Sequence, residues 1–290
     1  MFSGSYVAIV TPFKNGKFDE SAYRALIEWH IVEGTNGIVP VGTTGESATL
    51  EYEEHYRVIQ VAVETAAKRV PVIAGTGANS TSETIMMTKV AKELGADGAL
   101  LVCPYYNKPT QEGLYQHFKA VAESVDLPLV LYNVPGRTAI NIEPQTVLRL
   151  SEVPNIVAIK EASGDMKQAS ELIRLCGDKM DVLSGDDFTT FSLMAMGGKG
   201  VISVCANILP RLTSLLCKYM LANQVLQARE VHFKLEPLNK VLFIETNPIP
   251  VKTALSLMGK IDEEFRLPLC MMSKNNKDTL RSVLASYGIV

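Results

Sequence analysis

The sequence predicts an α/β protein, a (β/α)8 TIM barrel with a helical C-terminal extension. Eight short apolar segments, rich in β-branched residues, recur in the 290-residue chain, and segments with apolar residues at helical spacing lie between them. Nearly continuous hydrophobicity is typical of parallel strands that are buried on both faces. A barrel requires eight strand–helix repeats to close, whereas an open doubly wound sheet rarely contains so many. No G-x-G-x-x-G follows the first apolar segment, which removes the main support for a dinucleotide-binding sheet.

The predicted elements follow the order of these segments. The strands are expected to begin near Val7, Gly37, Val70, Gly98, Pro128, Ile156, Asp181 and Gly200. The clearest helices are expected at residues 21–33, 52–68, 82–94, 112–124 and 167–175. The strand pattern stops near Leu221, and the remaining residues read as helices interrupted by Asn-Pro-Ile-Pro at residues 247–250. We therefore predict a catalytic barrel over residues 1–222 and a helical extension over residues 223–290.

The composition limits the partners and the location of the protein. A net charge of −3 without any basic cluster argues against nucleic acid as a partner. No apolar run approaches the ~20 residues that span a bilayer, and the N-terminus lacks the pattern of a signal peptide. The five cysteines have no C-x-x-C spacing and do not suggest a disulfide framework. We expect a protein of the reducing cytoplasm with no nucleic-acid or membrane partner.

Polar residues cluster where the predicted strands end, and few polar residues lie where the strands start. They are Thr11, residues 43–46, residues 75–77, Tyr105, Tyr106, Tyr132, Asn133, Lys160, Glu161, Ser184, Gly185, Asp186 and Ser203. In a barrel of this type the chemistry lies at the carboxyl ends of the strands. The sequence therefore predicts an active site at this end.

Lys160 is the most informative of these residues. It ends the predicted sixth strand, so alternation directs its side chain either into the barrel or towards the helix layer. A buried ammonium group is costly unless it is paired or neutralised. One interpretation is a structural ion pair with Glu161 or with a carboxylate on a helix. The other is a desolvated amine that attacks a carbonyl carbon, and the position at the strand end favours this nucleophile.

Four further residues have two interpretations each. Tyr132 ends the fifth strand and is either a rim residue with a hydrogen-bonded hydroxyl or a proton shuttle beside a Schiff-base lysine. Thr43 and Thr44 stand between two glycines and form either a turn with a helix cap or a carboxylate-binding loop. Arg137 follows the fifth strand and is either solvated or a bidentate carboxylate ligand.

The sequence does not predict a metal or an organic cofactor. The four histidines lie in predicted helices without metal-ligand spacing, and no cluster of Asp, Glu and His suggests a catalytic metal. Imine chemistry on a lysine requires neither.

Seven motifs in series closely resemble the dihydrodipicolinate synthase family, which belongs to the N-acetylneuraminate lyase and class I aldolase superfamily. They lie at residues 42–46 (GTTGE), 104–109 (PYYNKP), 132–138 (YNVPGRT), 159–161 (IKE), 184–187 (SGDD), 200–204 (GVISV) and 247–252 (NPIPVK). The resemblance covers essentially the whole chain in order. The Gly-Arg-Thr at residues 136–138 distinguishes the synthases from the sialic acid lyases, which lack this arginine. The family often has Ser before the arginine, where this chain has Gly136.

The resemblance implies an enzyme of lysine biosynthesis by the diaminopimelate route. Its lysine would condense with pyruvate, and the enamine would attack L-aspartate 4-semialdehyde to give 4-hydroxy-tetrahydrodipicolinate. The implied catalytic residues are Lys160, Tyr132, Thr43 and Tyr106, and the implied substrate-binding residues are Thr44, Arg137, Gly185 and Ile202. Tyr106 would reach in from a neighbouring subunit, which implies at least a dimer, and the family is usually a tetramer built as a dimer of dimers.

The resemblance also implies an inhibitory site for L-lysine at the tight-dimer interface. Its residues would be Ser47, Ala48, His55, Asn79, Glu83 and Tyr105. Glu83 can pair with an ammonium group, and Asn79 and Tyr105 can hydrogen-bond a carboxylate. Tyr52 stands where some lysine-sensitive enzymes carry a His, so the strength of inhibition stays open.

Two other functions stay open on the sequence alone. An N-acetylneuraminate lyase-like 2-oxo acid aldolase would use the same lysine and tyrosine to cleave a longer sugar acid. A barrel that has lost catalysis and serves as a binding protein is less consistent with the intact Lys160, Tyr132, Thr43 and Arg137.

Overall fold

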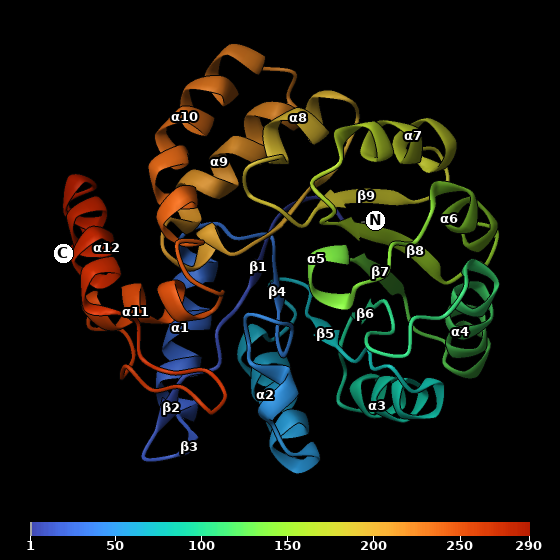
Figure 1. The fold of residues 1–290 in the computed structure, drawn as a ribbon, viewed down its shortest axis with the longest axis horizontal. Helices are drawn as coiled ribbons and strands as arrows, with labels where there is room; N and C mark the ends of the chain where they lie inside the picture. The colour runs from blue at the N-terminus through green and yellow to red at the C-terminus, as the bar shows by residue number, and fades with distance from the viewer. Residues whose placement is uncertain (1) are drawn as a thin grey trace.

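Eight parallel strands form a nearly closed barrel at the centre of the computed structural model, which describes residues 2–290 (Figure 1). The strands are β1 (Gly4–Ala8), β4 (Gly37–Val39), β5 (Ile73–Gly75), β6 (Gly98–Val102), β7 (Leu129–Asn133), β8 (Ile156–Glu161), β9 (Asp181–Ser184) and β10 (Gly200–Ser203). They are hydrogen-bonded in the order β4-β1-β10-β9-β8-β7-β6-β5. A parallel bridge between Ile38 and Val72 brings the two ends of this sheet together. The predicted (β/α)8 barrel is therefore confirmed.

Helices surround the barrel (Figure 1). They are α1 (Glu20–Val32), α2 (Tyr52–Ala66), α3 (Thr81–Glu93), α4 (Gln111–Ser124), α5 (Pro135–Thr138), α6 (Pro144–Leu150), α7 (Met166–Cys176), α8 (Thr190–Ala195) and α9 (Pro210–Leu221). Three of them begin at a side-chain cap, where Asp19, Thr110 or Asp165 accepts a hydrogen bond from a backbone N–H of the first turn. Among residues 2–290, no helix combines the length and hydrophobicity that crossing a bilayer requires.

The residues after α9 form only helices and loops: α10 (Val225–Val241), α11 (Ile249–Leu257) and α12 (Lys274–Ser286). Residues 242–248 separate α10 from α11, and the Asn-Pro-Ile-Pro segment at residues 247–250 spans the start of α11 instead of lying wholly between the two helices. Buried side chains of all three helices join one apolar core with α1, α2 and α9. These helices are therefore packed on the barrel, and a domain boundary between residues 222 and 223 stays a prediction.

Alternation along the strands divides the buried side chains into two layers. The inner cluster, which fills the barrel, contains Phe2, Tyr6, Ala8, Val39, Ile73, Leu100, Val130, Tyr132, Val134, Ala158, Leu183 and Ile202. The intervening residues of β7 and β8, such as Leu131 and Ile159, pack instead against the helices. Successive side chains of a strand point to opposite faces, so this division fixes which strand-end residues face the interior.

A short hairpin that the sequence reading missed follows β1. Strands β2 (Phe13–Lys14) and β3 (Lys17–Phe18) pair antiparallel around Asn15 and Gly16, which have φ angles of 53° and 76°. Asn-Gly is the preferred pair for such a two-residue turn because both positions need positive φ. The dipeptide is therefore the signal that predicts this hairpin.

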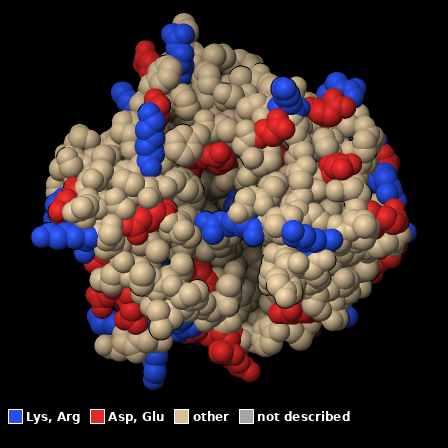
Figure 2. All heavy atoms as spheres, viewed as in Figure 1, with Lys and Arg blue, Asp and Glu red and all other residues tan. Residues whose placement is uncertain are grey.

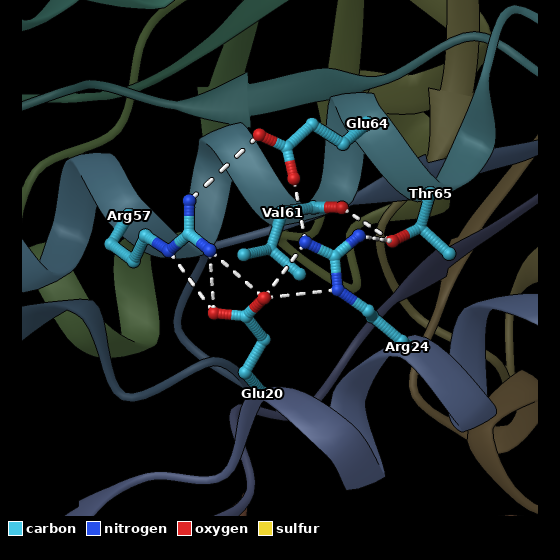
Figure 3. Close-up of polar contacts among 6 residues, drawn as sticks. All are labelled: Glu20, Arg24, Arg57, Val61, Glu64 and Thr65. Carbon is cyan, nitrogen blue, oxygen red and sulfur yellow. Dashed lines mark hydrogen bonds and ion pairs between the residues drawn. The ribbon is translucent and has the colours of Figure 1, made fainter.

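An ion-pair network joins α1 to α2 at the surface (Figure 3). Glu20 accepts hydrogen bonds from both Arg24 and Arg57, at 2.8 and 2.7 Å, and Arg24 also reaches Glu64 at 2.6 Å. The hydrogen bond from Arg24, and after it the one from Arg57, lowers the pKa of Glu20. The stability that these bonds contribute is therefore present at neutral pH and is lost on acidification. The side chains are 35–42% exposed, and each such pair contributes only about 0–1 kcal/mol.

Candidate active site

Lys160 and Tyr132 lie side by side at the carboxyl ends of β8 and β7, where they are register partners. Both continue the inward-facing positions of their strands, two residues after Ala158 and Val130. Lys160 is only 6% exposed, and its Nζ lies 4.0 Å from the centroid of the Tyr132 ring. The pair therefore places an amine, which can act as a nucleophile, beside a phenol, which can carry protons, at the mouth of the barrel.

Lys160 does not form the structural ion pair that the sequence left open. Glu161 faces the helix layer, where it accepts hydrogen bonds from Asn133 Nδ2 at 3.0 Å, Gln168 Nε2 at 3.2 Å and the Ser163 N–H at 2.6 Å. Of residues 2–290, no carboxylate forms an ion pair with Lys160. A lysine that is buried without a carboxylate partner is suited to nucleophilic attack on a carbonyl carbon.

Gly185 follows β9 and packs directly against the lysine side chain. A Cβ atom at this position would lie 2.9 Å from both Cγ and Cε of Lys160 and 2.7 Å from the Cβ of Ala162. Real Cβ atoms do not approach so closely, so a larger residue here would displace the lysine. The predicted site residue Gly185 thus lies against Lys160, and Ile202 lines the same inner cluster.

Thr44 and Arg137 are connected by Asn247, which begins the motif at residues 247–252 but was not among the predicted site residues. Asn247 donates from Nδ2 to Thr44 Oγ1 at 3.0 Å, and its backbone oxygen accepts a hydrogen bond from Arg137 at 3.1 Å. Arg137 is exposed on α5, which lies over the barrel mouth in Figure 1. Asn247 is 203 and 110 residues from its two partners, so no local pattern predicts these contacts.

The loop with Thr43 and Thr44 forms a turn with open N–H groups. Gly45 N–H donates to Gly42 O and Glu46 N–H to Thr43 O, both at 3.1 Å, so the backbone curls tightly. Neither threonine caps a helix. In the part of the chain that the structure describes, the N–H groups of Thr43 and Thr44 have no protein acceptor. Two neighbouring free N–H groups beside the Thr44 hydroxyl suit a carboxylate.

A buried ion pair between Glu46 and Lys252 holds the end of this loop. Glu46 Oε1 and Lys252 Nζ lie 2.5 Å apart, and both side chains are 0% exposed. Lys252 Nζ also lies 4.2 Å from the centroid of the Phe13 ring. Burial lowers the pKa of Lys252, and the charge of Glu46 opposes this shift. The pair anchors the end of the threonine loop to α11, and neither residue was predicted for this role.

Tyr106 is not part of this site within one chain. Its side chain is 90% exposed and its φ angle is 73°, in a loop after β6. Lys160, Tyr132, Gly185 and Ile202 thus lie in one group at the barrel end. Thr44, with its neighbour Thr43, is joined to Arg137 through Asn247, and Tyr106 projects into solvent. Figure 2 shows a hollow at the centre of this face, with Lys and Arg atoms lying across it.

The predicted lysine-site residues are distributed over α2, α3 and the loops beside them. Glu83 accepts a hydrogen bond from the Tyr52 hydroxyl at 2.8 Å, and burial together with the Glu83 charge raises the pKa of Tyr105. Asn79 is fixed through its backbone oxygen by Asn107, at 2.8 Å. His55 is buried in α2 rather than lying on the surface, and burial lowers its pKa to about 4. Ser47 and Ala48 belong to a short 3-10 helix (Ser47–Thr49) next to the threonine loop.

A (β/α)8 barrel with a buried, unpaired lysine beside a tyrosine at its carboxyl end has the features of the imine-forming aldolase class. The chain belongs to the dihydrodipicolinate synthetase family, whose model matches residues 1–287. It is 67% identical over the full length of both chains to the 4-hydroxy-tetrahydrodipicolinate synthase of Thermodesulfovibrio yellowstonii.

Solved structures agree with this family. The chloride-inhibited dihydrodipicolinate synthase of Acinetobacter baumannii, complexed with pyruvate, is 54% identical over 100% of both chains, with a TM-score of 0.98. A dihydrodipicolinate synthase from Cyanidioschyzon merolae with lysine bound is 39% identical over 100% of this chain and 99% of that one, with a TM-score of 0.96.

Proposed function

We propose that this chain is a 4-hydroxy-tetrahydrodipicolinate synthase, which condenses pyruvate with L-aspartate 4-semialdehyde through an imine on Lys160. The buried position of Lys160, without a carboxylate partner and beside Tyr132, is the observation that carries the proposal. Full-length identity of 67% to a protein of that name supports the same substrates. The N-acetylneuraminate lyase-like alternative is not favoured, because the relatives named here are all synthases.

In the proposed reaction Lys160 Nζ attacks the C2 carbonyl of pyruvate, and water leaves as the imine forms. Loss of a proton from C3 gives an enamine, whose C3 then attacks the aldehyde carbon of the semialdehyde. The substrate amine next adds to C2 and displaces the lysine, which closes the ring. Tyr132 and Thr43 carry protons in these steps, since imine formation and release each move several protons.

The two substrate carboxylates are assigned to different parts of the site. The open N–H groups of Thr43 and Thr44, with the Thr44 hydroxyl, are assigned to the pyruvate carboxylate, next to Gly185 and Ile202. Arg137 is assigned to the carboxylate of the semialdehyde, because a guanidinium offers paired donors to it. The Asn247 bridge sets these two anion sites at a fixed separation.

Tyr106 is assigned to the active site of a neighbouring copy. Tyr106 is 90% exposed and its neighbour Tyr105 is 42% exposed, and exposed aromatic side chains that gather at one place mark an interaction surface. We therefore propose at least a dimer, with a tetramer of two such dimers as the expected assembly. Sedimentation equilibrium of the parent and of a Tyr106→Ala variant tests this: a monomeric and fully active parent would refute the shared site.

The proposed activity is tested with the purified protein and both substrates. Formation of the cyclic product from pyruvate and L-aspartate 4-semialdehyde, without cleavage of N-acetylneuraminate, is the expected result. Cleavage of the sugar acid without condensation would favour the aldolase alternative, and neither activity would favour a binding protein.

Replacing Arg137 by Ala is expected to weaken use of the semialdehyde selectively. The change removes the paired donors of the assigned carboxylate site, so KM for the semialdehyde should rise by roughly 10-fold or more. Borohydride trapping of pyruvate on Lys160 should be unaffected, since Arg137 lies on α5 and its guanidinium bonds to Asn247 O. The exposed Arg149 of α6 offers a matched control, Arg149→Ala. A loss of the pyruvate adduct in Arg137→Ala would contradict the assignment.

L-Lysine is expected to inhibit this enzyme partially, in a manner that excess pyruvate does not relieve. The expectation rests on Glu83, Asn79 and Tyr105, which offer partners to an ammonium and a carboxylate group, and on the lysine-bound relative. Tyr52 already occupies Glu83 through its hydroxyl, so lysine must displace or share that bond. Glu83→Ala should abolish the inhibition, whereas Glu93→Ala at the exposed end of α3 should leave it intact. An unchanged rate in millimolar lysine would exclude this site.

A further inference from the structure

A buried polar network lies directly behind the candidate active site, on the helix side of β7 and β8. Its side chains are those of Asn133, Asn141, Glu161 and Gln168. Asn133 Nδ2 donates to Glu161 Oε2 at 3.0 Å and to Asn141 Oδ1 at 2.8 Å. The amides of Asn141 and Gln168 exchange two hydrogen bonds, at 2.7 and 3.0 Å. Asn133 and Glu161 are 0% and 3% exposed, so the bond between them forms out of contact with water, while Asn141 and Gln168 at the outer side are half-buried.

The network crosses the same two strands as the catalytic pair. Asn133 and Glu161 are register partners, one residue beyond the register pair Tyr132 and Lys160. Side chains alternate between the faces of a strand, so the two pairs share backbone but face opposite layers. The Asn133–Glu161 bond therefore ties the strand ends together at the point where the tyrosine meets the lysine.

Glu161 also reaches the next strand on its other side. Its backbone oxygen accepts a hydrogen bond from Gly185 N–H at 2.7 Å. Gly185 is the residue that packs against Lys160 Cγ and Cε. Glu161 thus connects the ends of β7, β8 and β9, the three strands that carry Tyr132, Lys160 and Gly185.

The groups that surround the Glu161 side chain are all hydrogen-bond donors, which is the environment that suits a carboxylate. Its two oxygens accept from Asn133, Gln168 and the Ser163 N–H, and an acceptor-only group satisfies all three donors. No Lys or Arg of residues 2–290 pairs with it. Burial of a carboxylate without a cation is costly, and a fully satisfied buried network is rigid. The arrangement is thus better explained by placement of the strand ends than by stability alone.

We infer that Glu161 is a positioning residue, which acts through this network to hold Tyr132 against Lys160 for proton transfer. The inference rests on the proposed function. Misplacement of reacting groups by ~1 Å can lower a rate about 10²-fold, so small shifts of the strand ends matter. Glu161 itself faces away from the barrel interior and does not touch substrate.

Substitution of Glu161 tests this inference against a matched control. Gln111 makes three hydrogen bonds in the same outer layer, to Asn141 O, Glu143 N–H and Thr146 Oγ1, but none to β7 or β8. Glu161→Ala should lower kcat by roughly 10-fold or more, with KM for pyruvate within about two-fold of the parent. Gln111→Ala should lower Tm while kcat stays within about two-fold. An equal loss of kcat in both variants would overturn the inference.

A conservative variant, Glu161→Gln, and a Tyr132→Phe background separate a positioning role from general destabilisation. Glu161→Gln retains the size of the side chain but turns an N–H₂ towards one of the three donors, so it carries the test where Glu161→Ala does not fold. On a Tyr132→Phe background, Glu161→Gln should lower kcat much less than on the parent, because residues that act as a unit are not additive. The same fold loss in both backgrounds, or a folded Glu161→Gln with the parent kcat, would refute the role. A failure of the proposed function is distinguishable, because the parent itself would then lack condensation.

Discussion

Lys160→Arg should fold normally and lose condensation by roughly 10³-fold or more. Arginine keeps the positive charge, but its guanidinium is always protonated and cannot form the imine. In the parent, sodium borohydride with pyruvate should add a reduced three-carbon group to the peptide that contains Lys160. In Lys160→Arg this mass shift should disappear, while the circular dichroism spectrum and Tm stay close to those of the parent.

The matched control is Lys167→Arg, at an exposed lysine in the first turn of α7. It makes the same chemical change seven residues further along and should leave both the adduct and the rate unchanged. An adduct on a lysine other than Lys160, or an active Lys160→Arg, would refute the imine mechanism.

The fold was largely predictable because its main signals are local. Each barrel strand is buried on both faces, so it appears as an apolar run, and each long helix shows its own periodicity. The short elements were not predicted. The β2–β3 hairpin has two residues per strand, and α8 has six, which is too few for a periodic pattern.

The candidate site was predictable to the extent that strand ends carry it. Tyr132, Lys160 and Gly185 lie at the carboxyl ends of the successive strands β7, β8 and β9, so parallel topology alone brings them together. The direction of Lys160 could not be read from the sequence, because Lys160 and Glu161 are adjacent and a shift of one residue exchanges their faces. Inward-facing Ala158 and Val130 settle it in the structure.

Support for the site from the C-terminal helices was not predictable. Asn247 and Lys252 contact residues 44 and 46, from which they are separated by 203 and 206 positions. Such contacts depend on how α11 packs on the barrel, for which a single sequence carries no periodic signal. Tyr106 shows the same limit in another form, since its assigned partner lies on a different copy of the chain.

Lys252→Met should destabilise the protein more than any surface substitution. The change leaves the buried Glu46 carboxylate with the Arg266 N–H, at 3.2 Å, as its remaining hydrogen-bond donor. Removing one partner of a buried ion pair lowers the free energy of unfolding by about 3–5 kcal/mol. For a domain of this size that corresponds to a Tm lower by roughly 10 °C, measured at one protein concentration because subunit association also contributes.

A matched control and a double variant separate the charge effect from packing. Lys179→Met removes a surface partner of Glu152, where the side chains are 43% and 65% exposed, and should change stability by less than about 1 kcal/mol. Glu46→Leu combined with Lys252→Met replaces both charges by apolar groups and should recover part of the lost stability, since no unpaired charge remains buried. Because Glu46 ends the threonine loop, Lys252→Met should also raise KM for pyruvate. A Tm equal to that of Lys179→Met would show that the Glu46–Lys252 pair does not anchor this loop.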